Sequence, residues 1–331
     1  MKATVLGAGA WGTALATVLA GKGYPTTLWS HRADLADSIN ADRVNKRYLP
    51  AAELPESLRA DSDLGRSLDG AELVVLVVPS HALRGVMKEA RPHLPDQALL
   101  CSATKGIEQE SLELMSEMLV HELGAAAEPR LTYLSGPSFA KETALRMPTA
   151  VVVAGTSSDA AHAVQRAFAT DRFRVYTSDD VPGVEIGGAL KNVVAIAAGI
   201  VDGLGFGHNS RAALITRGLA EIGRLGAVKG ANPMTLSGLS GMGDLVLTCT
   251  GELSRNRTVG VELGRGRTLK DILENLGHVA EGVKTSKSAY DLGKKLGVEM
   301  PITVEVYKVL YEDKSPQQAT IDLMTRDLKR E

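Results

Sequence analysis

One lysine interrupts a long apolar stretch in the second half of the chain. Lys191 is the only charged residue between Glu185 and Asp202, and its neighbours are Ile, Val, Leu, Ala, Gly and Asn. A buried ammonium is costly without a partner, and desolvation lowers the pKa of a lysine toward the range that suits proton transfer. The pattern predicts a general acid or base at Lys191, with Asn192 placed to orient a neighbour. The alternative is a lysine that reaches solvent along the apolar surface.

Polar turns follow two apolar runs in the first half. Lys105 follows residues 98–102, and Ser135-Gly136-Pro137-Ser138 follows residues 131–134. Ligands of open α/β sheets bind at the carboxyl ends of the strands, so both turns are candidate substrate contacts. The alternatives are a solvated lysine and a Ser138 that caps the next helix.

The best local site for an anion is Ser254-Arg255-Asn256-Arg257. Arginine binds phosphate through two parallel N–H bonds, and serine and asparagine add neutral donors. We interpret this stretch as an anion-binding loop, the alternative being a solvated loop.

A glycine motif follows the first predicted strand. Gly7-Ala-Gly9-Ala10-Trp11-Gly12 matches G-x-G-x-x-G, and a helix is expected over 13–22. The first glycine permits a tight turn, the second lets the backbone approach a pyrophosphate, and the third lets helix pack on strand. The motif predicts a nicotinamide dinucleotide site.

The end of the second predicted strand bears on the cofactor. An acidic residue there usually bonds the adenosine ribose, but this chain has Ser30-His31-Arg32 and no carboxylate before Asp34. An arginine can instead neutralise a 2′-phosphate, so NADP(H) is expected to be accepted alongside NAD(H). The alternative is a solvated surface arginine.

Histidine and cysteine patterns indicate no metal site. The seven histidines show no ligand pairing, and Cys101 and Cys249 have no ligand spacing. A carbonyl reduced by hydride then needs a cationic or hydrogen-bonding acid beside its oxygen, which lysines could supply.

Composition excludes several classes of partner. The 331 residues are 44% hydrophobic and 23% charged, with a formal net charge of −2. Nucleic acid and anionic membranes are not expected partners, and two separated cysteines fit a reducing compartment. No signal peptide is evident, and residues 186–201 are too short, too rich in Gly and Ala, and interrupted by a lysine to span a membrane. We expect a soluble, cytoplasmic protein.

These residues must be positioned by two different kinds of domain. Residues 1–180 alternate apolar strands with helices, which predicts a Rossmann-type, doubly wound, mostly parallel sheet. Residues 181–331 contain no convincing strand and predict an all-helical domain that carries substrate and catalytic groups. Expected strands are 2–6, 26–29, 73–78, 98–102, 131–134, 150–154 and 172–176, and expected helices include 111–123, 159–170, 184–204, 210–225, 269–276, 285–296 and 303–311.

Taken together, the motifs resemble the bacterial NAD(P)-dependent glycerol-3-phosphate dehydrogenases. The resemblance runs in order across nearly the whole chain. It rests on residues 7–14, Val78-Pro-Ser80, Ala103-Thr-Lys-Gly106, 134–140, Ala189-Leu-Lys-Asn192, 238–245, Ser254-Arg-Asn256 and Val279-Ala-Glu-Gly282.

The resemblance implies a role for each matching residue. Lys191 resembles the general acid/base, and Lys105 resembles a second active-site lysine. Substrate contacts would come from Lys105, Gly136, Ser138, Lys191, Asp244, Ser254, Arg255 and Asn256, with Arg255 and Asn256 on the phosphate. Besides the glycine motif, dinucleotide contacts would come from Trp11, His31, Arg32, Lys105, Ala140, Arg255, Val279 and Glu281. Asp244 would bond a substrate hydroxyl or position Lys191, and the sequence does not decide between these.

The expected reaction is the reversible reduction of dihydroxyacetone phosphate to sn-glycerol 3-phosphate for glycerophospholipid synthesis, by NADPH or NADH and without a metal. One rival is a β-hydroxyacid or 6-phosphogluconate-type dehydrogenase, which also places a lysine on the first long helix after its sheet. Another is a dinucleotide-sensing module without turnover. A homodimer is plausible from apolar helical faces in the second half.

Overall fold

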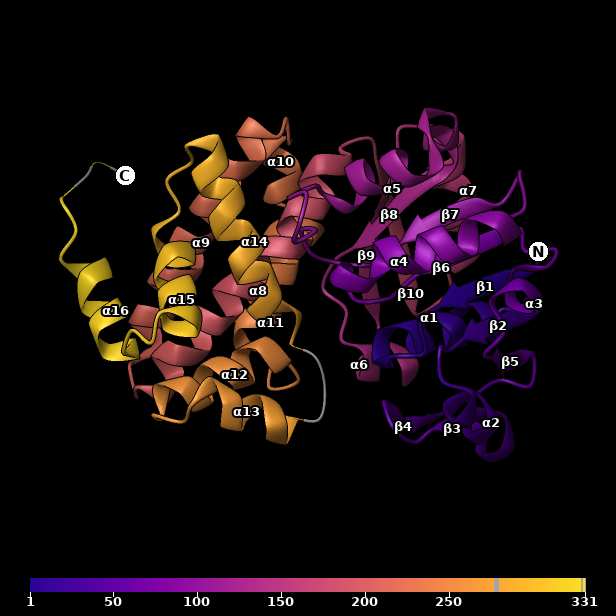
Figure 1. Cartoon of the computed structure of the whole chain (residues 1–331), viewed down its shortest axis with the longest axis horizontal. Helices are drawn as coiled ribbons and strands as arrows, with labels where there is room; N and C mark the ends of the chain where they lie inside the picture. Colours follow the sequence, from indigo (N-terminus) through magenta and orange to yellow (C-terminus); the bar gives the residue numbers. More distant parts are fainter. Residues whose placement is uncertain (277–279, 329, 331) are drawn as a thin grey trace. The chain divides into compact units, whose positions relative to one another are not determined.

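The computed structural model describes residues 1–276, 280–328 and 330, which divide into two compact units. Unit 1 comprises Met1–Lys105 and Glu113–Val184, and unit 2 comprises Gly106–Leu112 and Glu185–Glu331. Figure 1 shows strands and helices in unit 1 and helices in unit 2. The division falls four residues beyond the expected one at residue 180, inside helix α8 (Val181–Gly203), and residues 106–112 group with unit 2 although they were expected in the first domain.

Unit 1 is built on an eight-stranded sheet with the order β10-β9-β8-β7-β6-β1-β2-β5. The strands are β1 (Ala3–Leu6), β2 (Thr26–Trp29), β5 (Leu58–Asp61), β6 (Leu73–Leu76), β7 (Leu99–Ser102), β8 (Leu131–Ser135), β9 (Thr149–Ala154) and β10 (Phe173–Ser178). Neighbouring strands are parallel except β8 and β9, which run antiparallel. The predicted mostly parallel, doubly wound sheet is confirmed; the edge strand β5 and the reversed pair β8–β9 were not predicted.

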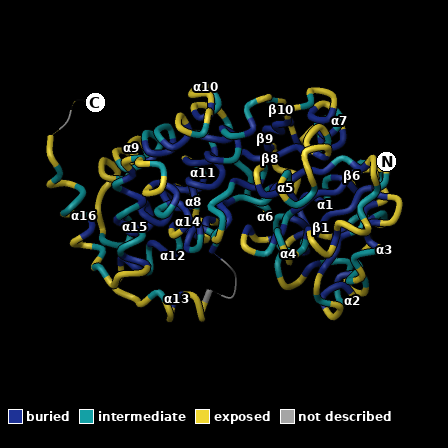
Figure 2. Tube along the Cα trace, turned by 45° about the horizontal axis from the view of Figure 1, so that its top comes forward, coloured by how far each residue is buried: buried dark blue, intermediate teal, exposed yellow. Residues whose placement is uncertain are grey.

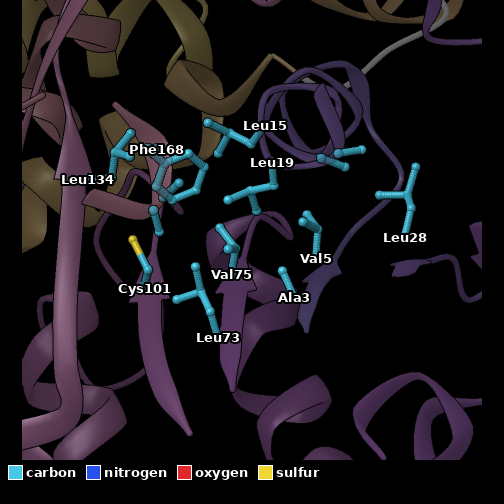
Figure 3. Close-up of a cluster of buried hydrophobic side chains, with 14 of the residues drawn as sticks. Ala3, Val5, Leu15, Leu19, Leu28, Leu73, Val75, Cys101, Leu134 and Phe168 are labelled. Atoms are coloured by element: carbon cyan, nitrogen blue, oxygen red, sulfur yellow. The ribbon is translucent and has the colours of Figure 1, made fainter. Parts of the chain in front are cut away.

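Alternate residues of the central strands form the core beneath one layer of helices. Val5 and Val75 are fully buried on neighbouring strands, and they cluster with Leu15, Leu19 and Phe168 from the helices (Figure 3). The intervening strand residues are buried as well. Burial on both faces explains why β6 is a continuous apolar run and why Thr4 is the one polar residue of β1.

Seven helices, besides the start of α8, and two short 3-10 turns complete unit 1 in the described residues. They are α1 (Ala10–Gly21), α2 (Ala33–Asp42), α3 (Leu64–Leu68), α4 (Ser80–Ala90), η1 (Arg91–His93), α5 (Met115–Leu123), η2 (Ala125–Arg130), α6 (Ala140–Ala144) and α7 (Ser158–Phe168). The expected start of the helix at Ser111 is wrong, and the physical reason is local. The Glu108 carboxylate accepts the N–H of Ser111 at 2.6 Å, and Leu112 takes a left-handed φ of 61°, so the helix begins only at Met115.

A small antiparallel hairpin, β3 (Val44–Asn45) and β4 (Leu49–Glu53), was not predicted. Its anchor is Asn45, which is fully buried and donates from Nδ2 to Ala8 O at 2.9 Å and to Thr13 Oγ1 at 2.8 Å. The hairpin is therefore fixed directly to the glycine turn.

In the described residues of unit 2 the regular elements are helices, as predicted. They are α8, α9 (His208–Val228), α10 (Pro233–Leu236), η3 (Leu239–Gly243), α11 (Asp244–Thr250), α12 (Arg255–Gly264), α13 (Leu269–Leu276), α14 (Glu281–Leu296), α15 (Pro301–Tyr311) and α16 (Pro316–Met324). Helices α10, α11, α12 and α16 and the π-helical η3 were not predicted.

Helix α8 is the buried axis of unit 2, and its trace is almost wholly in the buried colour in Figure 2. By length and composition it could cross a membrane, but 94% of its most apolar window is buried inside the protein. The expectation that this segment is too short to span a membrane is wrong, since the helix has 23 residues; its burial identifies it as a core helix.

Helices α8 and α12 touch through glycines. A Cβ built on Gly199 would lie 2.1 Å from Arg257 O, and one on Gly260 would lie 2.0 Å from Ile196 O. One turn further along each helix, a Cβ on Gly203 would lie 2.2 Å from Val261 O, and one on Gly264 would lie 2.6 Å from Ile200 O. The two backbones approach to a distance that side chains would prevent.

Candidate functional site

The glycine turn of unit 1 fits a dinucleotide phosphate group. Gly7 has a φ of +122°, and a Cβ there would lie 2.6 Å from Val77 O; a Cβ on Gly12 would lie 1.8 Å from Gly7 O. Gly9 caps helix α1 and has no heavy atom within 4 Å of its ideal Cβ. The first and third glycines are thus required by packing, while the second leaves open space at a helix N-terminus, where an anion is favoured.

Trp11 and Ala140 lie on one small apolar cluster. Both pack against the buried group Ala14, Leu49, Ala52 and Ala144, which joins α1, β4 and α6. The Trp11 Nε1 atom is buried and has no acceptor among the described residues. Ala10 is the first residue of α1. The cluster brings these three predicted cofactor residues to one end of α1, and their contact with a dinucleotide stays a prediction.

Beyond β2, Arg32 is held by an acidic neighbour. Its Nε donates to Asp34 Oδ1 at 3.1 Å, and its Nη2 donates to the other carboxylate oxygen. The hydrogen bond from Arg32 lowers the pKa of Asp34 and raises that of Arg32. This surface pair does not decide between a phosphate-binding and a solvated Arg32, so both stay predictions; His31 is exposed.

The predicted substrate residues of unit 1 converge on one carbonyl. Lys105 Nζ donates to Gly136 O at 3.4 Å, and Ser138 Oγ donates to the same oxygen at 3.0 Å. Gly136 has a φ of +142°, and a Cβ there would lie 2.9 Å from Val151 Cα, so the position favours glycine. The alternative role of Ser138 as a helix cap is wrong, because Phe139 is the N-cap of α6. Lys105, Gly136 and Ser138 form a polar group after β7 and β8.

In unit 2, Lys191 is the centre of a buried polar group. Its side chain is 9% exposed, and Nζ lies 2.5 Å from Asp244 Oδ1 and 3.0 Å from Thr248 Oγ1. The Thr248 hydroxyl donates to Asp244 O at 2.6 Å. The predicted burial of Lys191 is confirmed, and the alternative of a lysine reaching solvent is wrong. Asp244, itself 1% exposed, contacts Lys191 directly.

The predicted anion loop is a helix N-terminus. Ser254 is the N-cap of α12, with its hydroxyl accepting from Arg257 N at 3.2 Å, so the reading as a loop is wrong. Arg257 forms an ion pair with Asp202, in which Nη2 lies 2.6 Å from Oδ2. Arg255 is the first helical residue and has an exposed side chain. The arrangement offers one arginine beside the positive end of a ten-residue helix, which suits a phosphate.

Asn256 links three helices rather than facing solvent. Its Nδ2 donates to Asn192 Oδ1 at 2.9 Å, and its Oδ1 accepts from Gly282 N at 2.9 Å. The expectation that Asn192 orients a neighbour is confirmed. Glu281 begins α14 beside this link, and Val279 lies outside the described residues.

Two residues of this machinery were missed from the sequence. Thr248 lies one helical turn after Asp244, a spacing that would have pointed to it had α11 been recognised. Asn45 carried no readable signal, because its partners are far away in the chain. No cluster of three or more His, Cys, Asp or Glu suited to a metal occurs in residues 1–276, 280–328 and 330.

Fold and glycine turn place the chain among the Rossmann-type dinucleotide-binding oxidoreductases. Two family models match it, the NAD-dependent glycerol-3-phosphate dehydrogenase N-terminus over residues 2–161 and C-terminus over 180–321. The chain belongs to the family of NAD-dependent glycerol-3-phosphate dehydrogenases.

Individual relatives agree along the full length. The chain is 55% identical to glycerol-3-phosphate dehydrogenase [NAD(P)+] of Citrifermentans bemidjiense, covering 100% of this chain and 98% of the relative. It is 56% identical to that of Anaeromyxobacter dehalogenans, covering 100% of both. The crystal structure of glycerol-3-phosphate dehydrogenase from Coxiella burnetii superposes with a TM-score of 0.94 at 44% identity, covering 98% of this chain and 99% of that one.

Proposed function

We propose that this chain catalyses the reversible reduction of dihydroxyacetone phosphate to sn-glycerol 3-phosphate with NADPH or NADH. The observation that carries the proposal is the buried Lys191–Asp244–Thr248 group in a member of this family. In this reaction the carbonyl carbon of the ketone gains a hydride and the carbonyl oxygen gains a proton, and NAD(P)+ is released. The dihydronicotinamide supplies the hydride when bound.

Lys191 delivers the proton. Its Nζ gives a proton to the oxygen as negative charge develops there, and the neutral amine that remains is still held by Thr248 and Asp244. The carboxylate favours the charged ammonium before transfer, so Asp244 is proposed as the positioning residue for Lys191 rather than as a substrate ligand. Lys105, in unit 1, is proposed as a second lysine that contacts substrate.

The phosphate of the substrate is assigned to the start of α12. Arg255 supplies charge and donors, and the first backbone N–H groups of the helix supply further donors. Asn256 reaches a phosphate through its backbone N–H or through the second N–H of its amide, because the first is bonded to Asn192.

The test follows loss of NADPH and NADH absorbance with dihydroxyacetone phosphate as substrate. Lys191→Met should lower kcat by about 10²–10⁴-fold with little change in the KM for cofactor. Lys287→Met, which removes an exposed lysine of α14, is the matched control and should leave kcat unchanged. Near-normal turnover in Lys191→Met would refute the mechanism.

A substrate panel separates the rival classes. A β-hydroxyacid or 6-phosphogluconate-type dehydrogenase would oxidise hydroxyacids faster than sn-glycerol 3-phosphate. A sensing module would bind NADPH and show no ketone-dependent turnover. The family membership and the arginine at the start of α12 favour the phosphorylated ketone.

The cellular setting is proposed on the same basis. The product is expected to supply glycerophospholipid synthesis in the cytoplasm, and depletion of the protein should then lower cellular glycerol 3-phosphate. A homodimer is proposed from exposed apolar side chains of unit 2 such as Val228, Met234 and Met324. Sedimentation at the mass of one chain would contradict the dimer.

A further inference from the structure

The turn of the β3–β4 hairpin contributes to an open pocket near the end of β2. The pocket, with a volume of about 350 Å³, is lined by Arg32, Asp34, Leu35, Ser38, Lys46 and Arg47. Three cations and one carboxylate give this lining a formal charge of +2, whereas the whole chain has −2. The local charge therefore points to an anionic ligand.

Two of the three cations are already paired with carboxylates. Arg32 uses two nitrogens on Asp34, and Lys46 Nζ lies 2.7 Å from Asp42 Oδ1. Asp34 also repels any anion that approaches Arg32. Arg32 alone therefore offers a nearly neutral pair to a phosphate, which is a dianion near neutral pH.

Arg47 differs from both. Its guanidinium carbon lies 5.4 Å from the centre of the Tyr48 ring, which orients the side chain. Within the described ranges Arg47 makes no hydrogen bond or ion pair, and its side chain is exposed. Arg47 lines the same pocket as the Arg32–Asp34 pair. The net positive charge of the pocket thus rests mainly on Arg47.

The hairpin also sets where that charge lies. Asn45, immediately before the turn, is bonded through Nδ2 to Ala8 O in the glycine turn, and its Oδ1 accepts from Tyr48 N at 3.2 Å. The backbone of the hairpin is therefore tied to the turn where a dinucleotide phosphate would bind. In Rossmann-type folds the end of the second strand meets the adenosine ribose.

We propose that Arg47 is the specificity-determining residue for a 2′-phosphate on the adenosine ribose, binding it together with Arg32. The inference rests on the proposed function only in that a dinucleotide binds at the glycine turn. Arg47 donates two N–H groups to the phosphate, and its charge offsets the repulsion from Asp34. A ribose with a free 2′-hydroxyl gains nothing from Arg47.

Binding of two half-cofactors tests this without any turnover. Calorimetry compares 2′,5′-ADP with 5′-AMP on the full chain, for the wild type, Arg47→Gln, Arg47→Lys and Arg59→Gln. Arg59 is an exposed arginine of β5 that does not line the pocket, and in the part of the chain that the structure describes its side chain bonds only nearby carbonyls. Arg59→Gln therefore removes the same charge outside the pocket.

Arg47→Gln should lower the affinity for 2′,5′-ADP about tenfold to a hundredfold and leave the affinity for 5′-AMP unchanged. Arg47→Lys should retain part of the preference for 2′,5′-ADP over 5′-AMP, and Arg59→Gln should retain all of it. Added salt should reduce this preference in the wild type. A preference that survives Arg47→Gln overturns the proposal, as does equal weakening of both ligands. A wild type that binds both ligands equally also overturns it, while turnover of dihydroxyacetone phosphate with NADH would leave the proposed function standing.

Discussion

Removing one partner of the Lys191–Asp244 pair should cost far more stability than removing both. The Asp244 side chain is 1% exposed and that of Lys191 is 9% exposed, so either charge left alone has almost no solvent around it. Breaking a buried pair from one side costs about 3–5 kcal/mol. For a unit of this size that free energy corresponds to a fall in Tm of about 6–20 °C.

A double-mutant cycle measures the coupling. Lys191→Met and Asp244→Asn should each lower the free energy of unfolding by about 3–5 kcal/mol. The double variant contains two neutral side chains, so its free energy of unfolding should fall by less than about 2 kcal/mol. The bond from Thr248 Oγ1 to Asp244 O survives in all three variants, since its acceptor is backbone. The assay is urea unfolding at constant pH, with thermal unfolding as a second readout.

Turnover provides the independent control. The double variant lacks Lys191 and should remain as inactive as Lys191→Met even though its stability recovers. If the two single losses simply add in the double variant, the two charges do not stabilise one another, and the assignment of Asp244 as the positioning residue is refuted.

Three further predictions follow from burial and packing. Gly12→Ala should abolish dinucleotide binding, because its Cβ would lie 1.8 Å from a backbone oxygen. Gly21→Ala in the same helix has nothing within 4 Å of its Cβ and should be tolerated. Calorimetry with 5′-AMP should detect binding to Gly21→Ala and none to Gly12→Ala. Burial raises the pKa of the Glu221 carboxyl in the folded protein above its value in the unfolded chain. The ionised carboxylate therefore destabilises the folded protein at high pH, and this destabilisation disappears as the pH falls from the folded pKa to the unfolded pKa. Between pH 7 and pH 5, the free energy of unfolding measured in urea should therefore rise for the wild type relative to Glu221→Gln. A difference between the two proteins that stays constant over this range would contradict the raised pKa. Burial raises the pKa of the Cys101 and Cys249 thiols to about 12, so neither should react with a thiol reagent at pH 8 until the chain is unfolded; rapid labelling of the native protein would contradict this.

The sheet was predictable because its information is local. Strands such as β6 are buried on both faces, so an uninterrupted apolar run identifies them. The hairpin β3–β4 gave no such signal, since β3 has two residues and β4 contains Pro50 and alternates irregularly. Its stability comes from Asn45, whose bonds to Ala8 and Thr13 no local pattern reveals.

The site in unit 2 was predictable in part for the same reason. Lys191 was identifiable because a charge in an apolar helix violates the local pattern. Thr248 was not, because it lies 57 residues from Lys191 and joins it only in the folded chain. Helix α12 escaped prediction because glycines, rather than large apolar residues, form much of its buried face.

The glycine contact between α8 and α12 also determines how this part of unit 2 moves. Two helices separated by side chains can slide or roll while the rotamers between them rearrange, but here backbone meets backbone at Gly199 and Gly260 and no rotamers are available. We therefore expect the two helices to move as one stiff body. Lys191 lies on α8 and Arg255 at the start of α12, so we expect the proposed proton donor and the proposed phosphate-binding charge to keep their spacing through thermal motion.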